Sequence, residues 1–458
     1  MIAEFVEQEQ AMVAIASFTE NFAGGQLRQN VDCTKFFRQR FSEGGKLMNF
    51  RSMAAVLAAS VVLPLGAANA TDLEVTHWWT SGGEAAAVGE LAKAFDTTGN
   101  KWVDGAIAGS GSTARPIMIS RITGGDPMGA TQFNHGRQAE ELVQEGLMRD
   151  LTAVAEKGKW KDVIRPLSLL DSCTIDGKIY CAPINIHSWQ WLWLSNEAFE
   201  KAGTAVPKNW NEFVAAAPAL QKAGIQPLAL GGQPWQANGL FDVLIISLGG
   251  KDLYEKVYKD KDAEVAAGPE MAKIFAAAAQ ARDMAKGSNV QDWNQATNMV
   301  ITGKAGGQIM GDWAQGEFQV AGKKAGTDYT CLPGLGLNEF LTTGGDAFYF
   351  PLQKDDAKSE AQDILAATIV DPKTQVAFNL KKGSLPIRGD VDLAAANDCM
   401  KKGLDILAKG SVITSTDQLV SADTTKQKED LMSEFFANAS ITPEAAQKRF
   451  ADIIGSAD

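Results

Sequence analysis

The chain has few of the side chains on which most enzyme active sites and metal centres depend. Only three of its 458 residues are histidines, and the spacing of His77, His135 and His187 matches no metal-ligand pattern. HExxH, G-x-S-x-G and Walker motifs are missing from the sequence; Gly322-Lys323, for example, is followed by lysine instead of serine or threonine. We therefore expect no catalytic residue, no bound metal and no cofactor.

Positive charge is scarce relative to negative charge. Lysine and arginine number 43, aspartate and glutamate 55, and the net charge is −12 at pH 7. A protein of this sign repels the phosphates of nucleic acids, which excludes a nucleic-acid partner. The proportions of hydrophobic residues (45%) and charged residues (21%) are those of an ordinary globular protein, and the sequence has no internal repeat or low-complexity segment.

The apolar run at 53–66 is too short to cross a membrane comfortably, and it contains Pro64. It lies within 48–70, where one arginine, the apolar run and Ala68-Asn69-Ala70 follow each other in the order of a secretory signal peptide. A signal anchor is the alternative interpretation. We expect cleavage before Thr71 and a periplasmic protein, and no cysteine follows the cleavage point to carry a lipid.

Residues 1–47 precede this signal, although a signal peptide normally starts a chain. Glu43-Gly44-Gly45 requires purine-rich codons, which could form a ribosome-binding site just before Met48. We hypothesise that translation starts at Met48 and that 1–47 is a mis-assigned extension. Mass spectrometry of the native product should then give an N-terminus at Thr71, and a mature chain that keeps residues before Met48 would contradict the hypothesis.

Four cysteines follow the predicted signal, and export to an oxidising compartment favours disulfide bonds. Cys173 and Cys181 flank Asp176-Gly177-Lys178, which predicts a three-residue hairpin loop that sets the two cysteines roughly opposite each other. Of the three possible pairings we favour Cys173–Cys181 with Cys331–Cys399. Four buried thiols are the alternative.

Strand and helix patterns alternate along the chain, which predicts an α/β fold with βαβ units and mostly parallel sheets. Residues 71–458 are enough for two domains. Strands are expected at 73–79, 99–108, 130–134, 184–194, 300–310 and 347–352. Helices are expected from about residue 84, from about residue 428 to the C-terminus, and at 113–122, 138–145, 211–223, 240–246, 271–284, 360–370 and 372–378.

The segment LEVTHWWTSGGE at 73–84 joins a strand to a glycine-containing loop and a helix. In an open α/β sheet, ligands bind in the crevice beyond the carboxyl end of such a strand. Two adjacent tryptophans and a carboxylate there offer a flat apolar face and a hydrogen-bonding anchor. A pyranose ring presents the two matching surfaces, apolar C–H faces and an edge of hydroxyl groups. The segment therefore indicates a sugar site.

Four segments resemble those of a known family: LEVTHWWTSGGE at 73–84, GKIYCAPINIHSWQWLWLSNEAFEKAG at 177–203, GDWAQGEF at 311–318 and KKGSLPIRGDVD at 381–392. In this order, behind a secretion signal, the chain resembles the extracellular solute-binding proteins of sugar ABC importers, nearest to their glucose-binding branch and more distantly to maltose-binding proteins. The resemblance covers essentially all of 71–458. It implies a monomer with two α/β lobes, joined by hinge strands, that close on a sugar such as glucose and present it to the permease subunits in the inner membrane.

The resemblance also implies where the chain passes between the lobes. A first crossing is expected near Pro183-Ile184-Asn185. Cys331 and Cys399 both lie close to later crossings, where a bridge would tie segments together without locking the cleft. The two lobes would comprise 71–184 with 342–395, and 185–341 with 396–458.

Twelve residues are candidates for contact with the sugar. Trp79 and Glu84 match family positions for a stacking ring and a hydroxyl acceptor. Trp235, which follows a glycine-rich loop, would stack on the sugar face opposite Trp79. Asp312 could accept two charge-assisted hydrogen bonds from hydroxyl groups. The other candidates are Gln132, Asn134, His135, Asn185, His187, Asp346, Lys382 and Arg388.

Most of these candidates also have a purely structural interpretation. Either tryptophan could be a core residue, Glu84 could be a helix-start acid favoured by the dipole, and Trp78 is expected to pack rather than to touch the ligand. Which of Asn134 and His135 reaches the sugar stays open, with His135 by itself more typical of a solvent-facing loop. Asn185 and His187 could instead satisfy buried backbone groups, and Asp346 could instead serve a turn. Lys381, Lys382 and Arg388 could belong to a basic loop that faces solvent. Arg115 could point either into the cleft or into solvent.

Two other functions stay open. A secreted glycoside hydrolase is the enzymatic alternative, because Glu84, Asp312 and Asp346 supply carboxylates near aromatic residues, but the sequence does not indicate the required acid–base pair. A binding protein for a polyamine could use the same carboxylates with aromatic rings to hold ammonium groups. The neutral and basic candidates Gln132 and Lys382 suit a neutral polyol better.

Overall fold

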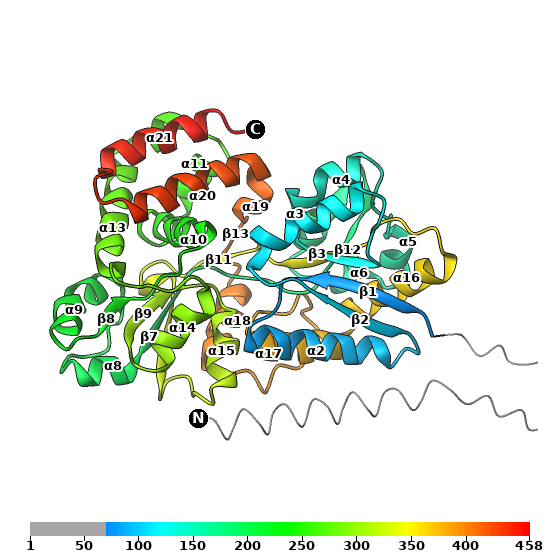
Figure 1. Cartoon of the computed structure of the whole chain (residues 1–458), viewed down its shortest axis with the longest axis horizontal. Helices are drawn as coiled ribbons and strands as arrows, with labels where there is room; N and C mark the ends of the chain where they lie inside the picture. Colours follow the sequence, from blue (N-terminus) through cyan, green and yellow to red (C-terminus); the bar gives the residue numbers. More distant parts are fainter. Residues whose placement is uncertain (1–69) are drawn as a thin grey trace, which may run out of the picture. The chain divides into compact units, whose positions relative to one another are not determined.

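The computed structural model describes residues 70–458, and Figure 1 shows how their helices and strands are arranged. The predictions for the signal peptide at 48–70 and for a translation start at Met48 lie outside the described residues, apart from residue 70 itself. Between residues 70 and 458, no helix is both long enough and apolar enough to cross a membrane.

A five-stranded sheet, in the order β2-β1-β3-β12-β6, forms the centre of the first lobe. β1 (Asp72–His77) lies between β2 (Lys101–Ala106) and β3 (Ala130–Asn134), and both pairings are parallel. β12 (Asp346–Tyr349) runs antiparallel to β3, and β6 (Cys181–Pro183) antiparallel to β12. The sheet therefore combines an N-terminal parallel part with two strands that enter in the opposite direction.

Helices cover both faces of this sheet (Figure 1). α2 (Gly82–Asp96) buries one face, including Leu91 and Phe95, as its apolar spacing predicts. It packs on α17 (Pro372–Lys382) and α16 (Asp356–Val370). Figure 1 shows α3 and α4 on the opposite side of the sheet. The other helices here are α3 (Ser110–Thr123), η1 (Arg137–Ala139), α4 (Glu140–Gln144), α5 (Thr152–Lys157), α6 (Trp160–Val163) and α7 (Ser168–Asp171).

A four-stranded sheet, in the order β10-β7-β9-β8, forms the centre of the second lobe. β7 (Trp191–Ser195) runs antiparallel to both β10 (Tyr329–Pro333) and β9 (Ala305–Ile309). Only β8 (Gln226–Leu228) is parallel to its neighbour, β9. The helices are α8 (Asn196–Lys201), α9 (Trp210–Lys222), α10 (Pro234–Leu244), η2 (Ile245–Gly249), α11 (Gly250–Tyr258), α12 (Ala263–Ala266), α13 (Pro269–Ala285), α14 (Trp293–Ile301), α15 (Ala314–Val320), α20 (Ala422–Ala437) and α21 (Pro443–Gly455).

Short elements lie between or beside the two sheets. β11 (Leu341–Thr342) pairs in parallel with β13 (Val412–Ile413), so the returning chain and the C-terminal segment are hydrogen-bonded to each other. The other short elements are the hairpin strands β4 (Thr174–Ile175) and β5 (Lys178–Ile179), η3 (Gly334–Gly336), α18 (Asp398–Ala408) and α19 (Thr416–Leu419). The residue boundaries given above for the two lobes stay a prediction.

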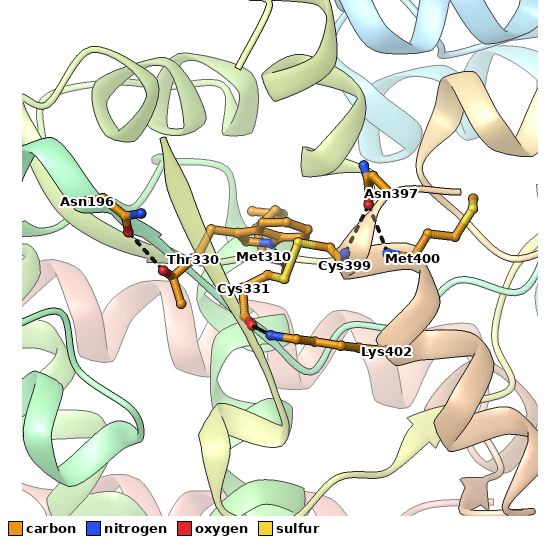
Figure 2. The surroundings of a disulfide bond; sticks show 9 residues. Asn196, Met310, Thr330, Cys331, Asn397, Cys399, Met400 and Lys402 are labelled. Carbon is orange, nitrogen blue, oxygen red and sulfur yellow. Dashed lines mark hydrogen bonds between the residues drawn. A yellow bond between two sulfur atoms is a disulfide. The ribbon is translucent and has the colours of Figure 1, made fainter. Parts of the chain in front are cut away.

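Both disulfides favoured from the sequence, Cys173–Cys181 and Cys331–Cys399, are present in the structure. The hairpin loop beside the first one has two residues rather than three, because Asp176 and Gly177 both adopt a positive φ and Lys178 already belongs to β5. The second one joins β10 to α18, and Figure 2 shows Lys402 of the same helix next to it. Lys402 Nζ donates to the Cys331 carbonyl at 2.8 Å.

Three predictions about the sheets and strands were wrong. Neither sheet is mostly parallel, because a chain that crosses between lobes brings returning strands in antiparallel. The strand predicted at 184–194 begins only at Trp191, and the residues before it cross between the sheets. The strand predicted at 300–310 begins at Ala305, because α14 extends to Ile301 and Gly303 reverses the chain with a φ of 66°. The C-terminal helix is two helices, α20 and α21.

Candidate functional site

A cavity of about 280 Å³ lies where segments of the two sheets meet. Its volume is near the lower end of the roughly 300–1,000 Å³ that is typical of small-molecule sites. Its wall is built from the loop after β1, the start of α3, the crossing segment around residue 187, and parts of α10, α19 and α20. The carboxyl ends of β1 and β3 contribute to this wall, as expected for an α/β sheet.

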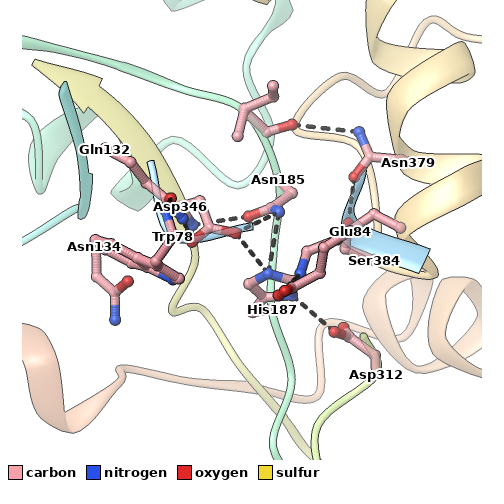
Figure 3. A network of polar contacts seen from close by, with 12 residues as sticks. Trp78, Glu84, Gln132, Asn134, Asn185, His187, Asp312, Asp346, Asn379 and Ser384 are labelled. Carbon is pink, nitrogen blue, oxygen red and sulfur yellow. Dashed lines mark hydrogen bonds and ion pairs between the residues drawn. The ribbon is translucent and has the colours of Figure 1, made fainter. Parts of the chain in front are cut away.

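His187 holds two carboxylates together at the centre of the site (Figure 3). Its Nδ1 lies 2.7 Å from Asp312 Oδ1 and its Nε2 lies 2.6 Å from Asp346 Oδ2. Burial favours the neutral ring and by itself would lower the pKa of His187. The two carboxylates outweigh burial and raise this pKa to about 9. Burial by itself would raise the pKa of Asp346, but His187 outweighs burial and holds this pKa well below its ordinary value. His187 is therefore a cation at neutral pH.

Asp346 is held in place by a second layer of amide groups. It accepts hydrogen bonds from Gln132 Nε2 at 2.7 Å and from Asn185 Nδ2 at 2.9 Å. Asn185 Oδ1 in turn accepts the backbone N–H of Asp346 at 2.8 Å, and Gln132 Oε1 accepts that of Trp78 at 3.0 Å. Both amides are fully buried and neither lines the cavity. Their contacts place them behind Asp346, and contact of either one with a ligand stays a prediction.

Asp312 also lies behind the cavity surface. Its Oδ1 faces His187, and its Oδ2 accepts the backbone N–H of Ser188 at 2.9 Å. Both oxygens are thus engaged by the protein, and Asp312 does not line the cavity. The expectation that it accepts two hydroxyl groups of the sugar stays a prediction, and the contacts seen here place Asp312 behind His187.

Lys382 and Glu84 form a buried ion pair on the cavity wall. Lys382 Nζ, at the end of α17, lies 2.8 Å from Glu84 Oε1, at the start of α2. Glu84 Oε2 also accepts a hydrogen bond from the backbone N–H of Ser81 at 3.5 Å. Glu84 therefore caps the start of α2 and lines the cavity at the same time. The ammonium group has three donors, of which this carboxylate uses one. Lys382 can therefore donate further hydrogen bonds into the cavity.

Six tryptophans line the cavity: Trp78, Trp79, Trp189, Trp235, Trp293 and Trp313. Trp189 connects the group, with ring centroids 5.5 Å from Trp235 and 4.8 Å from Trp313. The Trp313 ring lies 4.9 Å from the His187 ring. Trp189 packs against α10 at Gly239, where even a Cβ would come within 2.3 Å of its ring. The cavity thus has an aromatic wall next to its charged centre.

The two adjacent tryptophans differ in burial, and Trp79, the expected stacking ring, is the more buried of the two. Trp79 is only 2% exposed, and its ring packs 5.6 Å from Phe348 and 5.2 Å from Phe378. Trp78 is only partly buried, and the Arg115 guanidinium lies 5.8 Å from its ring centroid. Although both line the cavity, Trp78 is the more accessible ring and Trp79 is mainly a core residue.

The structure separates Asn134 from His135. Asn134 lines the cavity, and its Nδ2 donates to Asp417 Oδ2 at 2.9 Å. His135 is fully buried with its Nδ1 2.8 Å from Ser172 Oγ, so the solvent-facing interpretation was wrong. Burial lowers the pKa of His135 to about 4. His135 does not line the cavity.

Arg388 lies away from the cavity. Its guanidinium donates to Asp390 at 2.8 and 2.6 Å and to the Val370 carbonyl at 3.0 Å. Of the twelve candidates, the cavity wall contains Trp79, Glu84, Asn134, His187, Trp235, Asp346 and Lys382. Those that do not line it are Gln132, His135, Asn185, Asp312 and Arg388.

Several wall residues are not among the twelve candidates. Trp313 lies in the GDW motif beside Asp312 and could have been proposed with it. Asn238, Asp242 and Glu429, however, lie inside helices α10 and α20, where a polar residue usually faces solvent. Among residues 70–458, no group of three or more histidine, cysteine, aspartate or glutamate residues is placed to hold a metal.

Comparison with known proteins agrees with this geometry. Residues 79–366 match the family model of the bacterial extracellular solute-binding proteins. A probable sugar-binding periplasmic protein of Brucella melitensis biotype 1 is 38% identical over 377 residues, which cover 81% of this chain and 88% of that one. One of the same description from Rhizobium meliloti is 37% identical, over 80% of this chain and 87% of that one.

Solved structures show the same fold at lower identity. A chitin oligosaccharide binding protein superposes with a TM-score of 0.70 at 20% identity, over 85% of this chain and 99% of that one. Maltose-bound MalE3 of T. maritima superposes with a TM-score of 0.66 at 17% identity, over 84% of this chain and 99% of that one. These likenesses show the two-lobed fold.

Proposed function

The chain belongs to the bacterial extracellular solute-binding proteins, and from this premise we propose that it binds a neutral sugar, such as glucose or a related monosaccharide, in the cavity. The observation that carries the proposal is the aromatic wall beside the charged centre, where six tryptophans line the same cavity as His187, Asp346 and Lys382. Rings of this kind cover the apolar C–H faces of a pyranose, and the charged groups meet its hydroxyl edge.

The polar groups of the cavity are held in place by other side chains of the protein. Asp346 is held by two amides and His187, and Lys382 is held by Glu84, so binding loses little side-chain entropy. One lone pair of Asp346 Oδ1 and two donors of Lys382 stay available for hydroxyl groups. The cavity thus offers both an acceptor and donors, which suits hydroxyl groups better than the ammonium groups of a polyamine.

The same contacts argue against a catalytic acid at the His187 centre. A glycoside hydrolase needs a protonated carboxyl group across the scissile bond from a second carboxylate. Asp346 is kept ionised by His187, and Glu84 is paired with Lys382. We propose that these carboxylates hold hydroxyl groups and transfer no proton.

The transport role follows from the two lobes. A sugar that touches both lobes favours the closed state by the contacts that exist only there. We propose that the protein works in the periplasm as a monomer and delivers its sugar to the permease subunits of an ABC importer. The relatives named as probable sugar-binding periplasmic proteins support this role.

Calorimetry of the purified protein against glucose, galactose, mannose and spermidine tests the proposal. We expect at least one sugar to bind and spermidine to give no heat. Thermal unfolding should shift upward with the same sugar, because binding to the folded state at about 100 times Kd adds roughly 2.7 kcal/mol of stability. Binding of spermidine without a response to any sugar would contradict the proposal.

A further inference from the structure

The two ring nitrogens of His187 are bonded to carboxylates that belong to different sheets (Figure 3). Asp346 begins β12 of the first sheet, and Asp312 follows β9 of the second sheet. Of the forms of a histidine ring, only the imidazolium carries a proton on each nitrogen. The two hydrogen bonds therefore need a bound proton, and loss of this proton leaves one of the carboxylates facing a nitrogen lone pair.

Asn185 determines which carboxylate loses its hydrogen bond. Its Nδ2 lies 3.1 Å from His187 Nε2 and can donate to this nitrogen once the nitrogen carries a lone pair. The neutral ring then keeps its proton on Nδ1, toward Asp312, which also accepts the backbone N–H of Ser188. Asp346 Oδ2 is left only 2.6 Å from a lone pair. Loss of the proton therefore disturbs Asp346 rather than Asp312.

Asp346 is also the carboxylate of this pair that lines the cavity. Its Oδ1 accepts a hydrogen bond from Gln132 and has a second lone pair for a ligand hydroxyl group. Both nitrogens of His187 already donate to carboxylates, so the ring has no donor left for a ligand. His187 thus acts on a ligand through Asp346, because a carboxylate that turns away from the lone pair or takes up the lost proton becomes a poorer acceptor.

Three further ionisable groups face this centre from neighbouring elements. Lys382 of α17 attracts both carboxylates and is itself paired with Glu84 of α2. His135, which follows β3, would repel the charge on His187, but burial lowers the pKa of His135 to about 4 and the ring is uncharged above pH 7. The carboxylates next to His187 outweigh burial and hold its pKa at about 9, so its proton can be removed within an accessible pH range.

We propose that His187 is a positioning residue for sugar binding, which aims Asp346 at the ligand only while the ring carries both of its protons. The inference rests on the proposed function and couples sugar affinity to proton binding. The affinity is then highest while the ring is charged and falls as the pH rises through about 9. Because linkage is reciprocal, binding of the sugar near this pH takes up a proton from solvent.

Calorimetry of the native protein between about pH 7 and about pH 10.5 tests the coupling, with whichever of glucose, galactose and mannose binds most tightly at about pH 7. The Kd should be constant up to about pH 8 and rise roughly tenfold per pH unit above 9. Titrations near pH 9 in two buffers of different ionisation enthalpy should show uptake of about half a proton per sugar. Circular dichroism at each pH identifies the range in which the protein is folded.

Two variants assign the titration to His187. His187→Gln has no titrating proton, so it should bind the sugar at least tenfold more weakly at about pH 7 and show no alkaline fall in affinity. Asp312→Asn still offers an oxygen to the ring but removes one of the carboxylates that stabilise its charge, so the fall should move to lower pH by about one unit or more. His77→Gln is the matched control, because His77 is also buried and bonded to a carboxylate, Asp104, yet neither residue lines the cavity. It should keep the native midpoint.

A constant Kd without proton uptake in the native protein would overturn the coupling and leave sugar binding intact. The native alkaline fall in His187→Gln, or the native midpoint in Asp312→Asn, would assign the titration to another group and overturn the role of His187. If His187→Gln does not fold, the midpoint of Asp312→Asn decides. Absence of binding by any of the three sugars at about pH 7 would contradict the proposed function instead.

Discussion

His187 joins a carboxylate from each lobe, Asp346 on β12 and Asp312 after β9, so its charge affects stability. Its pKa in the folded protein is about 9, against about 6.5 when unfolded. Because the folded value is higher, the stabilisation is complete below pH 6.5 and is lost as the pH rises through 9. We predict that the free energy of unfolding falls by up to about 3 kcal/mol over this interval.

Urea unfolding of the native protein and of His187→Gln, at several pH values from 6.5 to 9.5, measures this loss. The variant should be less stable at pH 6.5 and show a shallower decline with pH. His135 is present in both proteins, so its own contribution to the pH dependence cancels in the comparison of the two profiles. Parallel pH profiles for the two proteins would show that His187 is not charged in the folded state.

The two adjacent tryptophans should respond differently to truncation. Trp78→Ala removes a partly exposed ring and should weaken sugar binding roughly tenfold, about 1.4 kcal/mol, with little loss of stability. Trp79→Ala empties a core position between Phe348 and Phe378 and should lower the free energy of unfolding by about 3–5 kcal/mol. Calorimetry and urea unfolding of both variants separate the two effects, and a greater loss of stability in Trp78→Ala would reverse the assignment.

At the scale of the elements, the two disulfides close chain loops of different length. Cys331 and Cys399 are 68 residues apart, whereas Cys173 and Cys181 are 8 apart. In the chain-entropy model, the longer loop stabilises by about 4 kcal/mol and the shorter by about 2.5 kcal/mol. We predict that replacing both cysteines of the longer loop by serine lowers the free energy of unfolding more than the same change in the shorter loop. Urea unfolding under oxidising conditions tests the order, which equal losses would contradict.

Elements with a regular apolar pattern were predictable from the sequence. The strand at 130–134 and the helices around α9 and α13 lie within a few residues of their expected positions, because each buries one face of a regular repeat. The prediction of a strand at 184–194 was wrong because of where its residues lie. Its residues are buried while they cross between lobes, and burial without a sheet looks like a strand in the sequence.

The site was predictable where a motif ends a strand. Asn134 ends β3, Asp346 begins β12, Glu84 follows the loop after β1, and all three line the cavity. Residues that support them, such as Gln132, cannot be told apart from them in the sequence. The alternation of apolar and polar residues shows that a polar side chain lies near a strand end, but not whether it lines the cavity or holds a neighbouring carboxylate from behind. Asn238, Asp242 and Glu429 were missed, because they come together only when α10 and α20 pack.

At the scale of the whole molecule, the start of α2 lies against α15. The Gly83 backbone N–H donates to Glu317 Oε1 at 2.7 Å, so an element of the first sheet contacts one of the second. The approach depends on glycine, since a Cβ on Gly83 would lie 2.6 Å from the carbonyl carbon of Gly316. The contact lies next to Glu84, so the contact with α15 and the ion pair with Lys382 share one helix start.

We predict that Gly83→Ala holds α2 and α15 apart and weakens sugar binding at least tenfold. The ligand gains affinity from contacts with both lobes, and raising the free energy of the closed state reduces the fraction of protein that can make them. Gly89→Ala is the matched control, because Gly89 lies on the same helix and a Cβ there would have no neighbouring atom within 4 Å. The control should bind normally and be slightly more stable, since alanine favours a helix by roughly 1 kcal/mol.

Calorimetry gives the affinities of both variants, and small-angle X-ray scattering with saturating sugar gives their radii of gyration. Gly83→Ala should remain larger than the native protein under these conditions, while Gly89→Ala should match it. Because an alanine at either position is compatible with a helix, a difference between the two isolates the contact with α15 from effects on α2 itself. Native affinity and native dimensions in Gly83→Ala would mean that the sugar is bound without close approach of these two helices.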